Sequence, residues 1–493
     1  MTHICLLTVL ILPAPQDETL RSRPIRIAKE TTYLTEPLDQ DGNVDYVEAL
    51  NRIHNQATAA TNANVAMRRV LGRTDGDEPL PREEYFQRLG ITIDETRLSL
   101  VPFQDFARTS ARDPADLSRE RRTITETPWD DSSCPFSTDW LAVNAAALQQ
   151  LRDAAKRPDW FEPLFSPTNR LIDVATPQDS RNAARLLVAS AMFKIGSNDK
   201  KRVWEDILTC KRIGAHVAQG ATVIEGLVGH AIENMARKAE YTFLSEVRLP
   251  NTIAQRYRKE LRNIRPPRDM ASRIAEAERF TFLEIVCALH RGEDIAENIA
   301  RAYSVRIDSV NAIKSADVDY NDVLVAGNAW FDRVAAVSAE PIGPDRFRKL
   351  QDITTKLVDF KPPDNATEYN GPDGAKQMAT AILRLMYAPR TLLAITNVEA
   401  RQLSRKRLSD IAWELRAFSR KNGEYPKELS DLESEQFKLP LDPFSGKPFV
   451  YSLDADDGCL IYGWSTNRKD DGGTEPGESV SQDYDDVVRL KKQ

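Results

Sequence analysis

Apolar residues recur at intervals of three and four positions through the middle of the chain, a spacing that predicts amphipathic α-helices. One such run follows Ser180, a residue type suited to an N-cap, and its apolar members are Ala184, Leu187, Val188, Ala191 and Met192. A second run continues to Gly220, and the two runs predict an antiparallel helix pair. The pair has the length of one helical-repeat unit, although Lys201 and Glu205 do not fit the tetratricopeptide pattern.

The same spacing predicts further helices toward the C-terminus. A third helix is expected from about 223 to 244, a fourth after an N-cap at Asn251, and others at 268–291, 295–313, 320–338, 344–358 and 373–387. Strand patterns are almost absent from this part of the sequence. We therefore predict a mainly α protein whose middle region is an irregular helical bundle or an α-solenoid-like array with a concave face for binding.

Residues 16–125 mix short helical and strand-like patterns with many charges. Thr31–Thr35 is predicted to be extended, and a turn is predicted at Asp41–Gly42. The acidic stretch 39–45 does not follow the EF-hand template, because its glycine falls at the fourth position and not at the sixth, so a turn is the preferred interpretation. A helix beginning near Val44 has an apolar face formed by Tyr46, Val47, Leu50 and Ile53.

Ile4–Ala14 is an uncharged apolar run. Its length suits the hydrophobic segment of a secretory signal peptide, here residues 1–15, and is too short to span a bilayer. Two features depart from a signal peptide: no Lys or Arg precedes the run, and cleavage after Ala14 would place Leu12 at the −3 position. The sequence favours export, to the periplasm or the extracellular space. The alternative is a buried first strand in a cytoplasmic protein.

The composition narrows the range of functions. A chain of 493 residues is expected to form two or three domains. Its formal net charge is −7 with both signs interspersed, whereas nucleic-acid binding needs a basic face, so we expect no nucleic-acid partner. Outside the N-terminal run the sequence has no apolar stretch long enough for a bilayer, and no transmembrane helix is predicted.

The sequence contains no established catalytic motif: HExxH, GxSxG, the P-loop and GxGxxG are all absent. His230, Glu233 and Glu225 share one predicted helix, and Glu284 and His290 share another, so two such helices could hold metal ions across a bundle. Their spacing differs from that of carboxylate-bridged metal proteins, which favours ordinary, partly buried polar residues. The sequence therefore favours a protein without catalytic activity.

Four cysteines follow the N-terminal run, and they are widely scattered: Cys134, Cys210, Cys287 and Cys459. Their spacing forms neither a CxxC pair nor a small disulfide framework. Cys134 has no adjacent base or helix-end signal that would activate its thiol. Cys210 and Cys287 lie on predicted apolar helix faces, where a cysteine acts as a small buried hydrophobe.

The C-terminal segment has the most specific pattern in the chain. A helix is predicted over 403–421, with an apolar stripe formed by Leu408, Ile411, Ala412, Leu415 and Phe418. It leads into the turn 423–426 (Gly-Glu-Tyr-Pro) and then into 442–451, where Pro443 and Pro448 restrict the chain around Gly446. These segments resemble the soluble domain of the major pseudopilins of type II secretion systems. The resemblance implies a small α+β module with an antiparallel sheet.

The resemblance also implies an ion site. In that family a loop near the C-terminus binds calcium through Asp side chains and backbone carbonyls. The matching positions in this chain are Asn467, Asp470, Asp471 and Asp485. Ser465-Thr466 replaces the family's glycine-containing pair, and a solvated acidic turn is the alternative interpretation.

Two further comparisons limit what the C-terminal pattern implies. Pseudopilins begin with a long apolar helix that enters the membrane, whereas the helix predicted at 403–421 is highly charged and follows about 400 unrelated residues, so membrane polymerisation is not expected. The whole chain resembles a group of large uncharacterised exported proteins of planctomycete-type bacteria, through Thr31–Asn51, Trp129–Asn144, the helices of 180–245 and the C-terminal module. That resemblance implies architecture and compartment, and no activity.

We therefore expect four regions: a signal peptide at 1–15, a mixed region at 16–125, a helical domain at 126–400 and a pseudopilin-like module at 401–493. The expected function is that of a non-catalytic scaffold or interaction protein of the cell envelope, with protein partners and calcium as its one candidate ligand. Two alternatives stay open. One is a soluble component of a secretion or pilus-like apparatus, and the other is an envelope metalloenzyme or hydrolase with its site among the middle helices.

Overall fold

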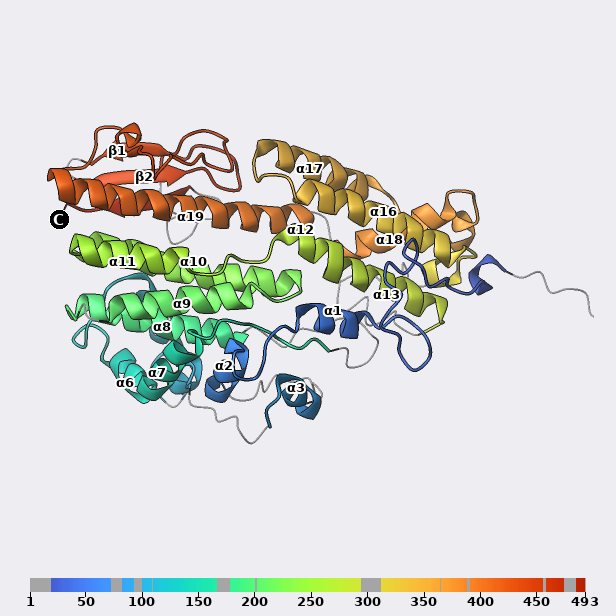
Figure 1. Cartoon of the computed structure of the whole chain (residues 1–493), viewed down its shortest axis with the longest axis horizontal. Helices are drawn as coiled ribbons and strands as arrows, with labels where there is room; N and C mark the ends of the chain where they lie inside the picture. The colour runs from blue at the N-terminus through green and yellow to red at the C-terminus, as the bar shows by residue number, and fades with distance from the viewer. Residues whose placement is uncertain are drawn as a thin grey trace, which may run out of the picture. The chain divides into compact units, whose positions relative to one another are not determined.

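A computed structural model shows a mainly α-helical chain with a three-stranded antiparallel sheet near the C-terminus, which confirms the predicted fold class (Figure 1). The structure describes residues 19–71, 82–92, 100–108, 110–165, 178–199, 202–293, 312–363, 365–387, 391–454, 458–473 and 485–492. Within these ranges no helix is long and apolar enough to cross a membrane. The predicted signal peptide at 1–15 and most of the helix predicted at 295–313 lie outside the described residues.

The chain forms two compact units, each built from separate stretches of sequence. Unit 1 consists of residues 1–44, 282–330 and 357–388, and unit 2 consists of residues 45–281, 331–356 and 389–493. Three helices contribute residues to both units: α13 (Arg279–His290), α16 (Tyr320–Ser338) and α17 (Pro344–Asp359).

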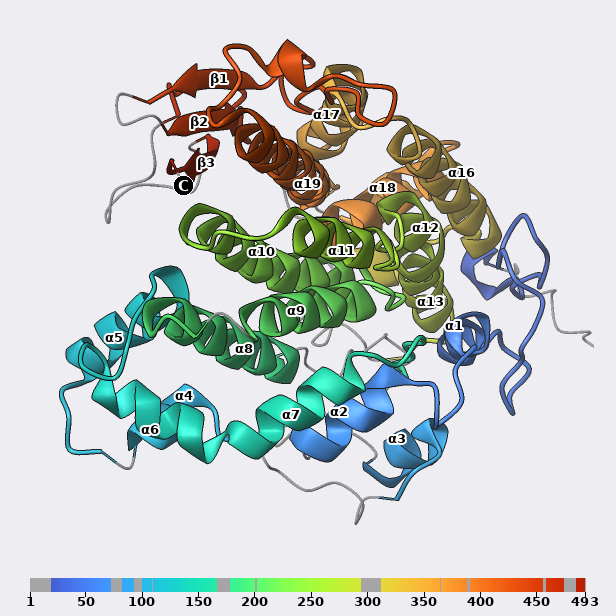
Figure 2. The ribbon, with the colours of Figure 1, turned by 60° about the vertical axis from the view of Figure 1, so that its left-hand side comes forward.

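Long helices form the centre of unit 2. α8 (Gln178–Gly196), α9 (Val203–Val217) and α10 (Val223–Glu246) pack in succession, as the predicted helix pair and third helix require (Figure 2). α19 (Thr391–Asn422) packs against α10. The buried apolar faces of these helices belong to one hydrophobic core, so burial of apolar surface holds the centre of the unit together.

Local sequence explains how α10 begins and how closely it packs. Thr222 and Glu225 form a capping box, in which each side chain accepts a hydrogen bond from the backbone N–H of the other residue. Gly229 lets α10 approach the end of α9, because a Cβ at this position would lie 2.5 Å from the backbone nitrogen of Ala218.

Shorter helices complete the helical part of unit 2. After α10 come α11 (Asn251–Arg262), α12 (Met270–Arg273) and the π-helix η3 (Ile274–Glu278), which continues into α13. Before α8 the chain forms α1 (Tyr46–His54), α2 (Ala63–Leu71), α3 (Arg82–Leu89), α4 (Phe103–Arg108), α5 (Pro114–Glu126), α6 (Pro135–Val143) and α7 (Ala145–Ala154).

The sheet follows α19 and the 3₁₀ turn η5 (Leu429–Leu432). β1 (Val450–Leu453), β2 (Cys459–Gly463) and β3 (Asp486–Leu490) pair in that order, with Tyr451 opposite Ile461 and Ile461 opposite Val488. Arg416 of α19 is fully buried and fastens the end of β3, because it donates hydrogen bonds to the carbonyls of Leu244 and Lys491, both at 2.7 Å. The sheet is therefore joined to α19 and α10 as part of one packed unit.

Unit 1 contains the parts of α13 and α16 within 282–330, together with α18 (Gly374–Met386) and the 3₁₀ turns η1 (Leu20–Ser22) and η4 (Ala366–Tyr369). Gly327 of α16 faces Phe282 of α13, and a Cβ there would lie 2.0 Å from the Phe282 ring. The two helices therefore pack ring against backbone at this point.

Several local predictions are confirmed and others are wrong. α16 and α18 match the helices predicted at 320–338 and 373–387. Thr31 and Thr32 form a turn and not an extended segment, because both backbone N–H groups bond to the carbonyl of Ala28. Ser180 lies inside α8 and is not its N-cap. Ile53 was expected on the buried face of α1, but 42% of its surface is exposed.

Candidate functional site

Three ionisable side chains from two distant segments of unit 2 meet beside the start of α10. His54 is the last residue of α1, Arg268 precedes α12, and Glu276 lies in the π-helix η3. Asp45 starts α1 by accepting a hydrogen bond from Glu48 N–H at 2.9 Å, and the helix of nine residues then ends at the imidazole.

The π-helix positions the carboxylate. Asp269 is the N-cap of α12, since it accepts hydrogen bonds from both the backbone N–H and the hydroxyl of Ser272 at 2.8 Å. The helix then widens over Ile274–Glu278, where i→i+5 hydrogen bonds replace the usual i→i+4 pattern. A π-helical turn contains more residues than an α-helical turn, which rotates the side chains that follow. A spacing of 3.6 residues per turn therefore does not predict the face on which Glu276 lies.

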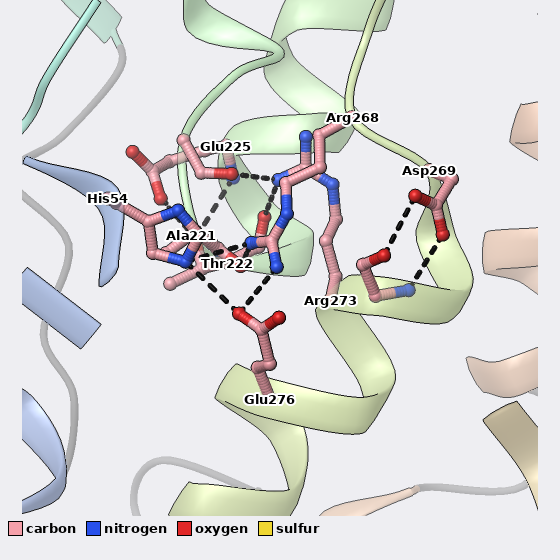
Figure 3. Close-up of polar contacts among 10 residues, drawn as sticks. His54, Ala221, Thr222, Glu225, Arg268, Asp269, Arg273 and Glu276 are labelled. Atoms are coloured by element: carbon pink, nitrogen blue, oxygen red, sulfur yellow. Dashed lines mark hydrogen bonds and ion pairs between the residues drawn. The ribbon is translucent and has the colours of Figure 1, made fainter. Parts of the chain in front are cut away.

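The three groups form a closed set of contacts, which Figure 3 shows. His54 Nε2 lies 3.2 Å from Glu276 Oε2 and 3.1 Å from the Arg268 guanidinium. Arg268 also donates to Glu276 Oε2 and, at 3.4 Å, to the carbonyl of Ala221. Burial opposes ionisation of Glu276, but the hydrogen bonds from His54 and Arg268 outweigh it, and the pKa of this carboxyl is lowered.

Two hydrogen-bond arrangements are possible at His54. His54 Nε2 either donates a hydrogen bond to Glu276 or accepts one from Arg268, because one ring nitrogen cannot do both at once. Its side chain is 18% exposed, that of Arg268 15% and that of Glu276 28%, so solvent reaches all three. The arrangement thus combines an acid–base group and a fixed cation at a partly accessible surface.

A second, buried layer of residues lies next to this cluster. Arg273 is fully buried and donates hydrogen bonds to the carbonyls of Ala218, Gly220 and Thr222, which fixes the loop between α9 and α10 (Figure 3). Burial lowers the pKa of its guanidinium to about 10. Arg268 binds the same loop, since its backbone N–H donates to the carbonyl of Ala218 at 3.0 Å. The loop is therefore held in place by two arginines.

Glu225 is the buried acid of this layer. Its carboxylate accepts hydrogen bonds from the backbone N–H and the hydroxyl of Thr222, both at 2.9 Å. Burial raises its pKa to about 7. Gly220 makes room for it, because a Cβ there would lie 2.0 Å from Glu225 Oε1. The hydroxyl of Thr222 is thus used in the cap, where it donates to the Glu225 carboxylate and accepts from the backbone N–H of Glu225.

The predicted calcium ligands lie in and around one C-terminal turn. Asn467 donates to Asp471 at 2.7 Å, and Asp485 accepts from the backbone N–H groups of Asp471 and Gly473 at 2.9 and 3.0 Å. Asp470 accepts from the hydroxyl of Tyr462 at 3.1 Å. In the described residues no group of three His, Cys, Asp or Glu side chains is arranged to hold a metal. The calcium site stays a prediction.

The histidine and glutamate pairs considered as metal ligands are divided between the units. His230 and Glu233 lie in unit 2, where burial lowers the pKa of His230 to about 4 and Glu233 pairs with Arg237. Glu284 and His290 lie in unit 1. Glu284 pairs with Arg291 at 2.7 Å, and His290 Nε2 lies 2.9 Å from the carbonyl of Arg23. The contacts of Glu233, Glu284 and His290 are those of structural polar residues.

The cysteines expected to be buried are buried, and all four described cysteines are free thiols. Burial raises the pKa of Cys210 and of Cys459 to about 12 and also raises that of Cys134. Thiols with raised pKa values are poor nucleophiles at neutral pH. None of the three therefore has the environment of a catalytic cysteine.

Sequence reasoning did not single out His54, Arg268 or Glu276. The Asp269–Ser272 cap is a readable helix start, but the π-turn after it has no sequence signature that we recognise. Searches of protein-family models, of curated proteins and of solved structures found no match to this chain.

Proposed function

We propose that the chain is a non-catalytic interaction protein, exported to the cell envelope, and that it contacts a protein partner around the charged cluster. The observation that carries this proposal is the exposure of two large apolar side chains, one next to His54 in sequence and one in the turn of α10 that follows the loop bound by Arg268. Ile53 is 42% exposed and precedes His54, and Ile224 is 56% exposed in the first turn of α10. We call Ile53, His54, Ile224, Arg268 and Glu276 the contact surface.

The chemistry of the contact surface suits a protein partner. Single exposed apolar residues are ordinary, but protein interfaces combine apolar side chains with arginine and avoid uncompensated charge. Here Arg268 is already paired with Glu276, so covering it costs less desolvation than covering a lone cation. The carbonyl of Ala221 and the carboxylate of Glu276 hold Arg268 in place, so binding would order few side chains.

The compartment and one alternative role rest on sequence. Export is supported by the apolar run Ile4–Ala14. A role as a component of a secretion or pilus-like apparatus is the second candidate, because α19 followed by a turn and a small antiparallel sheet agrees with the pseudopilin-like pattern. Co-purification with inner-membrane secretion proteins would favour that role, and its absence would count against it.

Site-specific photo-cross-linking tests the proposed interaction. A photoreactive phenylalanine analogue in place of Ile224 should give a discrete protein adduct in intact cells, and Ile53→Asp in the same chain should abolish it. The matched control is the same analogue in place of Val143, which is 54% exposed on α6. Equal adducts from both positions would contradict a specific contact surface.

Metal analysis tests the enzymatic alternative. The purified chain should contain no stoichiometric iron or zinc, and its metal content should be the same in His230→Ala and His290→Ala. Stoichiometric metal that disappears in either variant would overturn the non-catalytic proposal and favour a metalloenzyme.

A further inference from the structure

The N-terminal segment of unit 1 is bound through its backbone. We call residues 20–32 the strap; it lies beside α13 and α16 (Figure 1). Asp317 accepts a hydrogen bond from the backbone N–H of Arg21 at 3.1 Å. His290 Nε2 lies 2.9 Å from the carbonyl of Arg23, which it binds as a donor. Both contacts use peptide groups of the strap and not its side chains.

Two asparagines of α16 continue this pattern along the strap. Asn321 donates to the carbonyl of Pro24 at 3.2 Å and accepts from the N–H of Arg26 at 2.8 Å. Asn328 donates to the carbonyls of Glu30 and Thr31 at 3.0 and 2.8 Å. Only 4% of Asn321 and 6% of Asn328 is exposed, so leaving the side-chain NH₂ groups at these positions unpaired would be costly.

One charged contact adds a preference for basic peptides. Arg23 pairs with Asp319 at 3.1 Å, and the Asp319 side chain is 15% exposed. Burial opposes ionisation of Asp319, but hydrogen bonds from Asn321 and Arg23 lower its pKa, so the carboxylate is charged at neutral pH. We call His290, Asp317, Asp319, Asn321 and Asn328 the receptor face.

Packing explains little of why the strap is bound. A segment held mainly by the hydrophobic effect would bury its large apolar side chains. Instead Leu20 is 40% exposed and Ile27 is 39% exposed, while Asn321 and Asn328, which bind the strap backbone, are buried. Hydrogen bonds to main-chain groups give a bound peptide affinity, whereas pockets for its side chains give specificity.

We propose that the receptor face is a binding site for an arginine-containing peptide that follows the backbone path of the strap, and that residues 20–32 are the peptide it holds in cis. This goes beyond the proposed interaction function, since it concerns a different unit and is independent of the contact surface. The strap is covalently attached, so its effective concentration is on the order of millimolar, and a second peptide competes poorly until the strap is released.

A cleavable strap makes this testable. A protease site would be inserted between Gly42 and Asn43, in a turn where an added Cβ at Gly42 meets no atom within 4 Å. After cleavage and dilution, a fluorescent peptide of residues 19–33 should bind the cut chain saturably. The uncut chain should bind the same peptide about 100-fold or more weakly, because the strap competes in cis.

Backbone methylation distinguishes recognition from general stickiness. N-methylation of the peptide at Arg26 removes the N–H that donates a hydrogen bond to Asn321, and it should weaken binding about tenfold. The matched control is N-methylation at Ile27, whose N–H has no acceptor in the described part of the chain, and this should weaken binding less than about threefold. Equal losses, or no binding to a cut chain that keeps its helical circular dichroism, would overturn the proposal.

A second measurement uses the uncut chain, so that a cut chain that unfolds does not end the test. A solvent-sensitive fluorophore attached through Leu20→Cys, in a Cys5→Ser background, reports release of the strap; the cysteines of the described residues are buried and would not compete for the label. Millimolar peptide should shift the fluorescence, and the peptide methylated at Arg26 should need about tenfold more. An unchanged signal at several millimolar peptide would show that the strap is a fixed structural segment.

Discussion

His54 Nε2 lies 3.2 Å from Glu276 Oε2, although 222 residues separate the two in sequence. The contact joins the end of α1 to a π-helix, and Arg268 binds both residues. The tertiary structure, and not the local sequence, therefore brings the two residues together, and the contribution of each to stability depends on the other.

Glu276→Gln should lower the free energy of unfolding by about 1–2 kcal/mol at pH 7, because it removes the charge that accepts hydrogen bonds from Arg268 and His54. The folded-state pKa of Glu276 lies below 4.5, so its contribution is present above that value and is lost as the pH falls through the folded-state pKa. Urea denaturation at pH 7 and pH 3 measures both effects.

The matched control for this variant is Asp345→Asn, whose side chain is 83% exposed in its pair with Arg348. Its loss should stay below about 0.5 kcal/mol. A Glu276→Gln loss as small as that of the control, or one that is the same at both pH values, would contradict the assigned contacts.

Glu225→Gln should be more stable than the wild type at pH 8 and equal to it near pH 4.5. Burial raises the folded-state pKa of Glu225 from 4.5 to about 7, so folding binds a proton and stability falls as the pH rises between these values. The full difference is on the order of 3 kcal/mol, and a glutamine imitates the neutral acid. Denaturation curves at both pH values are the measurement. A variant that is less stable than the wild type at pH 8 would show that the ionised carboxylate is the stabilising form.

Gly220→Ala should destabilise the chain by about 2 kcal/mol, because the new Cβ would lie 2.0 Å from Glu225 Oε1 and force the carboxylate out of the capping box. The control is Gly343→Ala, where a Cβ would meet no atom within 4 Å, and it should change stability by less than about 0.5 kcal/mol. Thermal unfolding of both variants compares them. Equal melting temperatures of the two variants would show that the α9–α10 loop accommodates the new Cβ without loss of stability, which would contradict the prediction.

Calcium should raise the melting temperature of the wild type, and Asp471→Ala should abolish the rise, because binding to the folded state alone is stabilising. Asp454→Ala is the control, since this exposed aspartate precedes β2 and is not among the predicted ligands. Differential scanning fluorimetry with and without calcium measures the melting temperature of each variant. A wild type that does not respond to calcium would remove the predicted ion site.

Much of the helical fold could be predicted because its cause is local. α16 was predicted at 320–338 and occupies those residues, since an apolar face with a period of 3.6 residues must be buried. Start signals were less reliable. Serine is a common N-cap, yet Ser180 lies inside α8. Aspartate is equally common there, and Asp45 does cap α1.

The candidate site could not be predicted, because it depends on long-range geometry. Periodicity placed Ile53 with Tyr46 and Leu50 on a buried face, yet the helix ends at His54 and Ile53 is exposed. The meeting of His54 with Glu276 further depends on a π-turn, which shifts the helical register. Thr31 likewise turns the chain because its hydroxyl and N–H bind nearby carbonyls, a local competition that strand propensity ignores.

The size of the chain's complex in extracts of the native cell envelope tests the proposed interaction most directly. The wild type should migrate as an assembly larger than its own mass of 55.6 kDa. Ile224→Asp should return it to the mass of the free chain, whereas Val143→Asp, equally exposed but remote in sequence from the contact surface, should leave the assembly intact. A wild type that migrates as the free chain, or an assembly that survives Ile224→Asp, would contradict the account.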